Sequence, residues 1–171
     1  MDQYIFTSHI NRDWSKLVQL CEKNKEIDPN VHRYSFSSGG FYTYCMEPEQ
    51  FYDWHSDSFY LNGRYSGRRW ARIIYLTYGA PIQFGRWDWS CKNGKIDYID
   101  TGGWPIPERV EHSVDIYPGL EIRFPSFFLH RVPYISSVKN NRWAIVHLDT
   151  DHRDENEKEL FEQALTEYIK K

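Results

Sequence analysis

Apolar residues recur at helical spacing close to the start of the chain. These positions are Trp14, Leu17, Val18 and Cys21. Residues three and four apart lie on one face of an α-helix, so the spacing predicts a short amphipathic helix. The segment follows Asn11 and Asp13, two residue types that cap helix N-termini.

The other end of the chain predicts a second helix. Asp154 is followed three positions later by Glu157, which resembles a capping box. The apolar stripe that follows comprises Leu160, Phe161, Ala164, Leu165, Tyr168 and Ile169. Two predicted helices therefore flank the middle of the chain.

Between the helices the pattern is that of short β-strands. Aromatic and β-branched residues fill positions 41–45, 72–78, 82–84, 120–124 and 142–148, with glycine or proline between them. Residues 87–91 and 95–99 flank Asn93-Gly94, a pair that favours a tight hairpin because both positions need positive φ. Many short strands with turn residues between them predict a mainly β fold with flanking helices, a jelly roll or double-stranded β-helix.

Composition adds size and environment to this picture. With 171 residues, of which 18% are aromatic, the chain is predicted to form one domain over residues 1–171, with the β core at residues 40–150. A net charge of -3 and a pI near 6.2 give no reason to expect a nucleic-acid or anionic-membrane partner.

The cysteines and the N-terminus indicate where the protein works. Cys21, Cys45 and Cys91 are an odd number and widely spaced, which favours reduced thiols over a disulfide framework or a zinc ribbon. The N-terminus has no basic stretch followed by an apolar one, and no run of 18 apolar residues occurs. We therefore predict a soluble cytoplasmic protein.

Two His-x-Asp pairs are candidates for metal binding, at His55-Ser56-Asp57 and His147-Leu148-Asp149. Residues two apart on an extended segment point to the same side, so either pair can offer an imidazole and a carboxylate to one ion. The first pair is favoured because several strands separate it from a third candidate ligand, His130, whereas only His152 follows the second pair. Two imidazoles and one carboxylate form the facial triad of non-haem Fe(II) sites.

Structural alternatives exist for each of these residues. His55 and Asp57 are also compatible with a loop pair that bonds the backbone, and His130 with a satisfied core histidine beneath Phe127 and Phe128. His147 alternates away from the inward positions of its predicted strand, so we interpret it as structural or exposed.

Arg142 is the candidate for holding an anion. It shares a strand face with Ala144 and Val146, so it is expected to point inward, where a guanidinium without an anionic partner is costly. That partner is either a protein carboxylate or a bound dicarboxylate. Tyr44 and Tyr75 lie in predicted strands and can donate a phenolic hydroxyl to the same ligand, or serve only in aromatic packing.

Several short motifs follow one another in a characteristic order. The upstream ones are His55-Ser56-Asp57 and Ile74-Tyr75-Leu76-Thr77. The downstream ones are Pro118-Gly119-Leu120, Arg123-Phe124-Pro125-Ser126, His130-Arg131-Val132-Pro133, Arg142-Trp143-Ala144-Ile145 and Asp149. This order resembles the Fe(II)- and 2-oxoglutarate-dependent dioxygenases, most closely their prolyl-hydroxylase-like branch, over residues 40–150.

The resemblance implies a role for each site residue. His55, Asp57 and His130 would bind iron and form the catalytic centre. Arg142 would pair with the distal carboxylate of 2-oxoglutarate, and Tyr75 and Tyr44 would assist it. The implied cofactors and cosubstrates are Fe(II), 2-oxoglutarate and dioxygen, with ascorbate as an optional reductant.

The implied activity is hydroxylation of an unactivated carbon, with release of succinate and CO2. The substrate would be a small molecule, a peptide or a protein, and proline in a peptide is the leading candidate by resemblance alone. Two alternatives are a non-catalytic, cupin-like jelly-roll binding module and a cupin-type metal hydrolase or isomerase, which would not need Arg142. The segments 62–70 and 102–107 are candidates for the cavity mouth and a lid, or for plain surface loops.

The sequence departs from the closest branch in two places. The gap between His130 and Arg142 is longer, so residues 137–141 are expected to form an enlarged turn. A glycine pair that usually precedes the next strand is here Gly79-Ala80-Pro81, which is expected to alter the local loop.

Overall fold

The structure is a computed structural model and describes residues 1–29, 33–35, 41–57, 60–61, 64–65, 68–85 and 110–168. The predicted hairpin at Asn93-Gly94, the segment 102–107, Cys91 and Ile169 lie outside these residues. So do residues 62–63 and 66–67 of the segment 62–70. No helix in the described part of the chain has the length and apolar character needed to cross a membrane.

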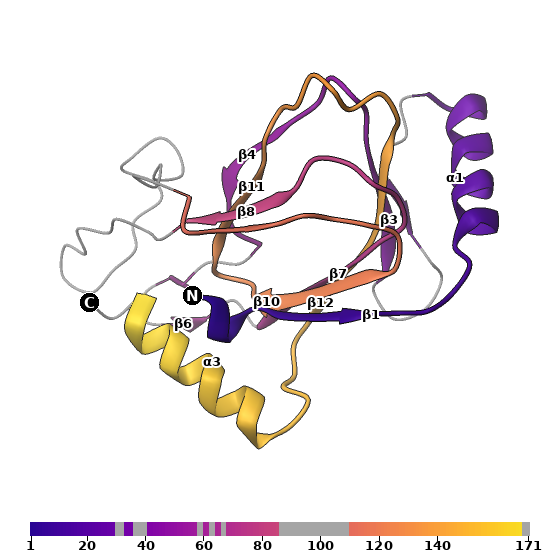
Figure 1. The fold of residues 1–171 in the computed structure, drawn as a ribbon. Coiled ribbons are helices and arrows are strands. Elements are labelled where there is room, and N and C mark those ends of the chain that lie inside the picture. Colours follow the sequence, from indigo (N-terminus) through magenta and orange to yellow (C-terminus); the bar gives the residue numbers. More distant parts are fainter. Residues whose placement is uncertain are drawn as a thin grey trace.

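A six-stranded antiparallel sheet forms the larger layer of the fold (Figure 1). Its strands, in spatial order, are β1 (Phe6–His9), β10 (Leu120–Pro125), β7 (Trp70–Tyr75), β12 (Arg142–Asp149), β3 (Tyr42–Met46) and β2 (Arg33–Ser35). Strands distant in sequence thus become neighbours, because β12 pairs with both β3 and β7.

A four-stranded antiparallel sheet forms the second layer. Its order is β4 (Tyr52–His55), β11 (Leu129–Val132), β8 (Ile82–Gly85) and β9 (His112–Val114). A separate two-stranded ribbon joins β5 (Tyr60–Leu61) to β6 (Arg64–Tyr65). The two larger sheets pack as a sandwich with flanking helices, which confirms the predicted double-stranded β-helix.

The core lies between the two sheets. On β10, Leu120, Ile122 and Phe124 are apolar and buried, and they alternate with Glu121 and Arg123 on the outer face. Phe124 meets Phe84 of β8 edge-on, with ring centroids 4.9 Å apart. This contact joins the two layers beneath the site described below.

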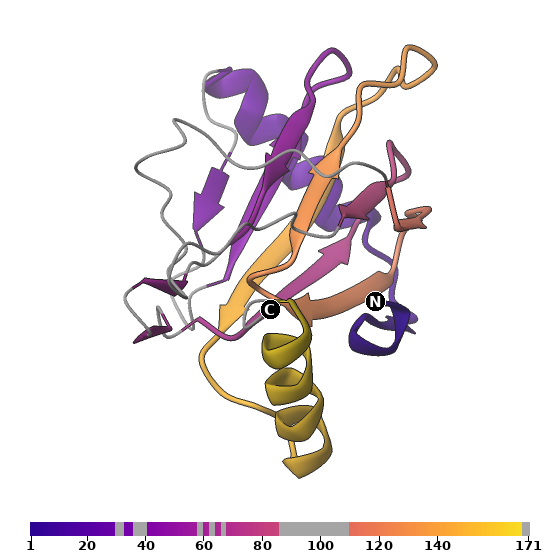
Figure 2. The ribbon, with the colours of Figure 1, turned by 90° about the vertical axis from the view of Figure 1, so that its left-hand side faces the viewer.

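Helix α1 (Ser15–Ile27) covers one part of the outer face of the six-stranded sheet (Figures 1 and 2). The N-cap of this helix is Trp14, whose side chain makes no capping hydrogen bond. The predicted cap Asp13 lies one position earlier, and its carboxylate accepts a hydrogen bond from the Ser15 amide at 3.0 Å. Cys21 packs with Cys45, Ile74 and Trp143 of the sheet. The amphipathic pattern of this helix is therefore satisfied by the sheet.

Helix α3 (Glu155–Tyr168) covers another part of the molecule, beside the short 3-10 helix η1 (Asp2–Tyr4). Asp154 caps it through the Glu157 amide, at 2.8 Å. The other half of the predicted capping box is not formed, because the Glu157 carboxylate instead accepts a hydrogen bond from Arg123 Nε at 3.0 Å. Arg123 is only 1% exposed. The Glu157 carboxylate therefore pairs with this buried cation and is not used to cap the helix.

One predicted strand ends earlier than expected. Residues 76–78 have strand-forming side chains, yet β7 ends at Tyr75 and the chain turns between Leu76 and Pro81 before β8 begins. The Thr77 hydroxyl accepts a hydrogen bond from the Trp143 amide at 2.9 Å, where a continued strand would have offered a carbonyl.

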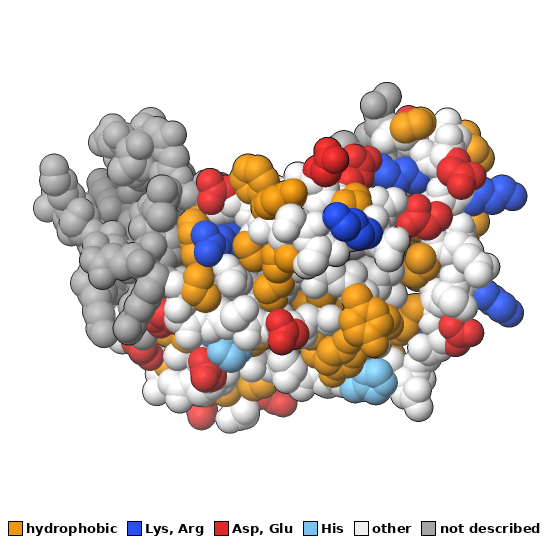
Figure 3. Space-filling view, turned by 45° about the horizontal axis from the view of Figure 1, so that its top comes forward, with side chains coloured by type: hydrophobic (Ala, Val, Ile, Leu, Met, Phe, Trp, Pro, Cys, Tyr) orange, Lys and Arg blue, Asp and Glu red, His pale blue; other side chains and the backbone are white. Residues whose placement is uncertain are grey.

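Charges of both signs are interspersed on the face shown in Figure 3. Apolar side chains gather in several groups among them. This face therefore carries no large field of a single sign.

Candidate metal centre

The two histidines of the predicted triad are cross-strand partners. His55 ends β4, and His130 of β11 is its register partner, so both side chains lie on the face that looks into the sandwich. Their ring centroids are 4.3 Å apart. Asp57 follows β4, and its amide donates to the Ser126 carbonyl at 2.9 Å, which returns the chain towards β11.

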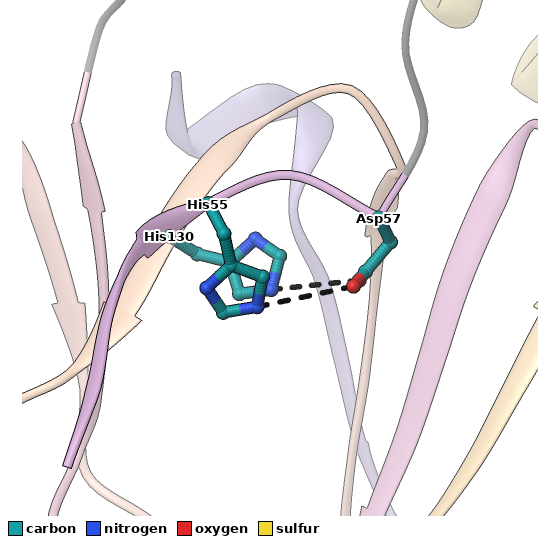
Figure 4. A group of neighbouring side chains, drawn as sticks. All are labelled: His55, Asp57 and His130. Atoms are coloured by element: carbon teal, nitrogen blue, oxygen red, sulfur yellow. Dashed lines mark ion pairs between the residues drawn. The ribbon is translucent and has the colours of Figure 1, made fainter. Parts of the chain in front are cut away.

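The Asp57 carboxylate faces both imidazoles (Figure 4). Its Oδ2 lies 3.4 Å from His130 Nε2, and its Oδ1 lies 3.9 Å from His55 Nε2. The three ligand atoms all lie within 4.8 Å of one another. Donors that bind one ion at about 2.1 Å are separated by about 3 to 4 Å, so the three groups fit a single metal ion.

The backbone selects the metal-binding nitrogen of each imidazole. His55 Nδ1 lies 2.7 Å from the Asp53 carbonyl, and His130 Nδ1 lies 2.9 Å from the Phe128 carbonyl. A carbonyl only accepts hydrogen bonds, so Nδ1 carries the proton in both rings and Nε2 offers its lone pair. Such support of the far ring nitrogen is typical of metal-binding histidines.

Burial also keeps His130 in the form that binds metals. Burial, reinforced by the neighbouring His55, lowers the pKa of His130 to about 4. The ring is only 4% exposed. At neutral pH it is therefore the uncharged imidazole that a metal ion requires.

The triad opens into a cavity of about 260 Å³ between the sheets. Residues from both layers line it: Tyr42, Tyr44, Met46, Tyr52, His55, Asp57, Ile73, Tyr75, Ile82, His130, Val132, Arg142, Ala144 and Val146. All six residues predicted for the site thus border one space. The alternative pair does not, because His147 lies against Asp149 and stacks on Phe41 at 4.1 Å on the outer face of β12.

Arg142 begins β12 opposite Met46 of β3 and points into the cavity, as its strand position predicts. It is 6% exposed. Its Nε donates to the Ala80 carbonyl at 3.2 Å, and its Nη1 lies 3.6 Å from the Met46 sulfur, a weak acceptor. Among the described residues no carboxylate pairs with it, so the protein-carboxylate alternative is not realised there and an anion from outside would complete the charge.

Tyr75 lies beside Arg142, with the guanidinium carbon 4.8 Å from the ring centroid. The side chain is fully buried, and within the described part of the chain its hydroxyl has no hydrogen-bond partner of regular geometry. Burial raises the pKa of Tyr75, which Arg142 partly offsets, so the phenol stays protonated at neutral pH. A ligand oxygen would satisfy this orphaned donor.

Tyr44 occupies the wall of the same cavity. It projects from β3 and meets Tyr52 edge-on, with ring centroids 5.5 Å apart. Its assistance to a cosubstrate remains a prediction. The three candidate metal ligands, the arginine without a carboxylate partner among the described residues and the buried Tyr75 hydroxyl together fit a metal ion and an oxygen-rich anion in this cavity.

The turn Gly79-Ala80-Pro81 supports Arg142, which sequence reasoning did not foresee. A side chain at Gly79 would bring its Cβ to 3.0 Å from the Cγ and Cδ atoms of Arg142, so glycine leaves room for the arginine stem. Ala80 contributes only its carbonyl, which no sequence pattern reveals. The departure from the family's glycine pair at this turn therefore lies next to Arg142.

Comparisons with known proteins give matches among solved structures only. No protein-family model matches the chain, and no curated protein matches it by sequence. The fold is similar to a prolyl-4-hydroxylase from Pseudomonas putida, with a TM-score of 0.52 and 13% identity, covering 84% of this chain and 86% of that one.

Two further solved structures match with lower scores. A viral collagen prolyl hydroxylase from Paramecium Bursaria Chlorella virus-1 has a TM-score of 0.40 and 12% identity, over 85% of this chain and 78% of that one. A 2OG-Fe(II) oxygenase-family oxidoreductase from Burkholderia pseudomallei has a TM-score of 0.41 and 12% identity, over 84% of this chain and 66% of that one. The resemblance inferred from the sequence is thus confirmed for the fold of the 2-oxoglutarate- and Fe(II)-dependent oxygenases and for the His-x-Asp…His triad.

Proposed function

We propose that this protein is an Fe(II)- and 2-oxoglutarate-dependent oxygenase that hydroxylates an unactivated carbon. The observation that carries the proposal is the buried Arg142, which has no carboxylate partner among the described residues and shares a cavity with a complete facial triad. A metal-binding module that binds no dicarboxylate would gain nothing from a buried cation at this position, because a buried charge without a partner destabilises the fold.

In this proposal His55, Asp57 and His130 hold the metal through Nε2, a carboxylate oxygen and Nε2. Their arrangement on one side leaves the remaining positions of the ion open to the cavity. When bound there, Fe(II) with 2-oxoglutarate and dioxygen supplies the oxidising chemistry that yields succinate, CO2 and a hydroxylated product.

Arg142 and Tyr75 hold the far end of the cosubstrate. The guanidinium offers Nη–H donors to a carboxylate, and the Tyr75 hydroxyl donates to the same group. Apolar side chains such as Ile73 and Val146 line the same cavity and lower its polarity, which strengthens these interactions.

Proline in a peptide is the substrate that we propose to test first. Its support is the structural likeness to a prolyl-4-hydroxylase, together with aromatic cavity walls at Tyr42, Tyr44 and Tyr52 that suit an apolar ring. We propose a cytoplasmic location and assign ascorbate the part of an optional reductant that keeps the iron ferrous.

An anaerobic titration of the purified protein with Fe(II) and 2-oxoglutarate tests the cofactor assignment. Chelation of iron by a 2-oxo acid produces a weak visible charge-transfer band, which we expect in the parent protein and not in His130→Ala. Arg142→Ala should shift the band to higher 2-oxoglutarate concentrations. Absence of the band in iron-loaded parent protein would overturn the proposal in favour of a cupin-like binding or hydrolytic site.

A further inference from the structure

A carboxylate outside the cavity holds the two neighbours of Arg142. Glu22 lies on α1, and its Oε1 accepts a hydrogen bond from Trp143 Nε1 at 2.7 Å. The side-chain amide of Asn141 donates to the same carboxylate, at 3.2 Å and 3.0 Å from its two oxygens. Glu22 therefore holds in place the residues immediately before and after Arg142.

The strand geometry turns this contact into control of the arginine. Side chains alternate along β12, so Arg142 points into the cavity while Asn141 and Trp143 point towards α1. A slip of one residue would place a neighbour in the cavity instead of the guanidinium. The contacts of Asn141 and Trp143 on the outer side therefore fix Arg142 as the residue that faces the cavity.

This end of β12 needs such support because its ladder is incomplete. On the β3 side the pairing begins at Arg142 itself, opposite Met46, but on the β7 side it begins only at Ala144, opposite Tyr75. Beyond that point the Trp143 amide bonds to the Thr77 hydroxyl at 2.9 Å. Side chains thus replace the missing part of the sheet.

We infer that Glu22 is a positioning residue for Arg142, acting through Asn141 and Trp143, and that it sets the affinity for the distal carboxylate of the cosubstrate. Thr77 supports the same strand end from the turn after β7. The inference rests on the proposed function, because it takes 2-oxoglutarate to be the dicarboxylate.

The test compares two ligands on the same protein. Binding of 2-oxoglutarate and of pyruvate, which has the 2-oxo acid group but no distal carboxylate, is measured by calorimetry on Fe(II)-loaded protein without oxygen. Glu22→Ala should weaken 2-oxoglutarate binding by about tenfold, as losing an outer support typically does, and leave pyruvate binding unchanged. Glu26→Ala, an exposed change one turn along the same helix, should alter neither.

Each outcome separates the two ideas. If the parent protein binds 2-oxoglutarate no better than pyruvate, the proposed function fails. If the parent prefers 2-oxoglutarate and Glu22→Ala keeps that preference, the positioning role alone fails; equal weakening of both ligands would likewise overturn it. Thermal unfolding checks that the variant is folded. Asn141→Ala, which removes one of the two side chains that bond Glu22, should show the same selective loss and decides the matter if Glu22→Ala does not fold.

Discussion

The guanidinium of Arg142 lies over the ring of Tyr75, with its carbon 4.8 Å from the ring centroid. The cation and the neighbouring phenol are both buried, and in the described chain neither has a polar partner that balances it: the arginine has no carboxylate and the hydroxyl has no hydrogen bond. Such a pair costs stability in the ligand-free protein, and a bound anion would offset this cost.

Removing the Tyr75 hydroxyl should therefore separate stability from binding. We expect Tyr75→Phe to keep or raise the free energy of unfolding, by up to about 1 kcal/mol, because a buried hydroxyl without a partner is unfavourable. The same change should weaken 2-oxoglutarate binding. Urea denaturation and the anaerobic titration measure the two effects, and a marked loss of stability would show that the hydroxyl has a structural partner.

Binding of the cosubstrate should stabilise the metal-loaded protein. A ligand at 100 times its dissociation constant stabilises the folded state by about 2.7 kcal/mol, which thermal unfolding detects. Arg142→Lys should lose most of this shift, because an ammonium cannot reproduce the two-pronged guanidinium contact. An unchanged shift in the lysine variant would mean that the dicarboxylate binds elsewhere.

The two His-x-Asp pairs should respond differently to substitution. Asp57→Ala removes the carboxylate that faces both imidazoles, so metal affinity should fall by more than about 100-fold and turnover should stop. His147→Gln, on the outer face of β12, is the matched control and should retain metal binding. Competition with a chelator measures affinity, and succinate release measures turnover; intact turnover in Asp57→Ala would refute the assigned ligand set.

Glu121 should contribute a pH-dependent part of the stability. Burial acts to raise the pKa of Glu121, but hydrogen bonds from Arg72 and Arg153 outweigh it and lower the pKa overall. A carboxyl group whose pKa is lowered by folding stabilises the protein above its unfolded pKa of about 4.3, and this contribution disappears as the pH falls through the folded value.

Glu121→Gln should thus destabilise the protein at pH 7 by about 1.5 to 3 kcal/mol, the range for hydrogen bonds to charged groups. The difference from the parent should shrink at pH 3. Urea denaturation at both pH values measures it, with the exposed Glu159→Gln as a control. A difference of equal size at both values would show that the contribution comes from packing and not from charge.

The inward position of Arg142 was predictable because strand alternation places it. His130 and Arg142 both occupy inward positions of strands, and the residues between the two could lengthen into a turn without changing either position. The capping residue Asp154 was also predictable, because a helix cap depends only on nearby backbone. At the first helix the prediction was one position off, since the N-cap is Trp14 and not Asp13.

Contacts between distant segments were not predictable. Glu22 and Trp143 are 121 positions apart. From the sequence alone, a glutamate on a helix is expected to be solvated, because the sheet that it contacts is not yet known. The strand β4, only four residues long, carries polar ligand positions that break the apolar pattern used to recognise strands. Beyond Tyr75, strand propensity was overridden because the Thr77 side chain takes over the hydrogen bond.

The halves of the site belong to different sheets. His55 and His130 come from the four-stranded layer, whereas Tyr75 and Arg142 come from the six-stranded layer. Packed sheets stand about 10 Å apart, and their spacing is set by core side chains such as Phe84 and Phe124. A ligand that binds both halves of the site must therefore match the distance between the two sheets. Repacking the core would change this distance, and with it the length of diacid that fits.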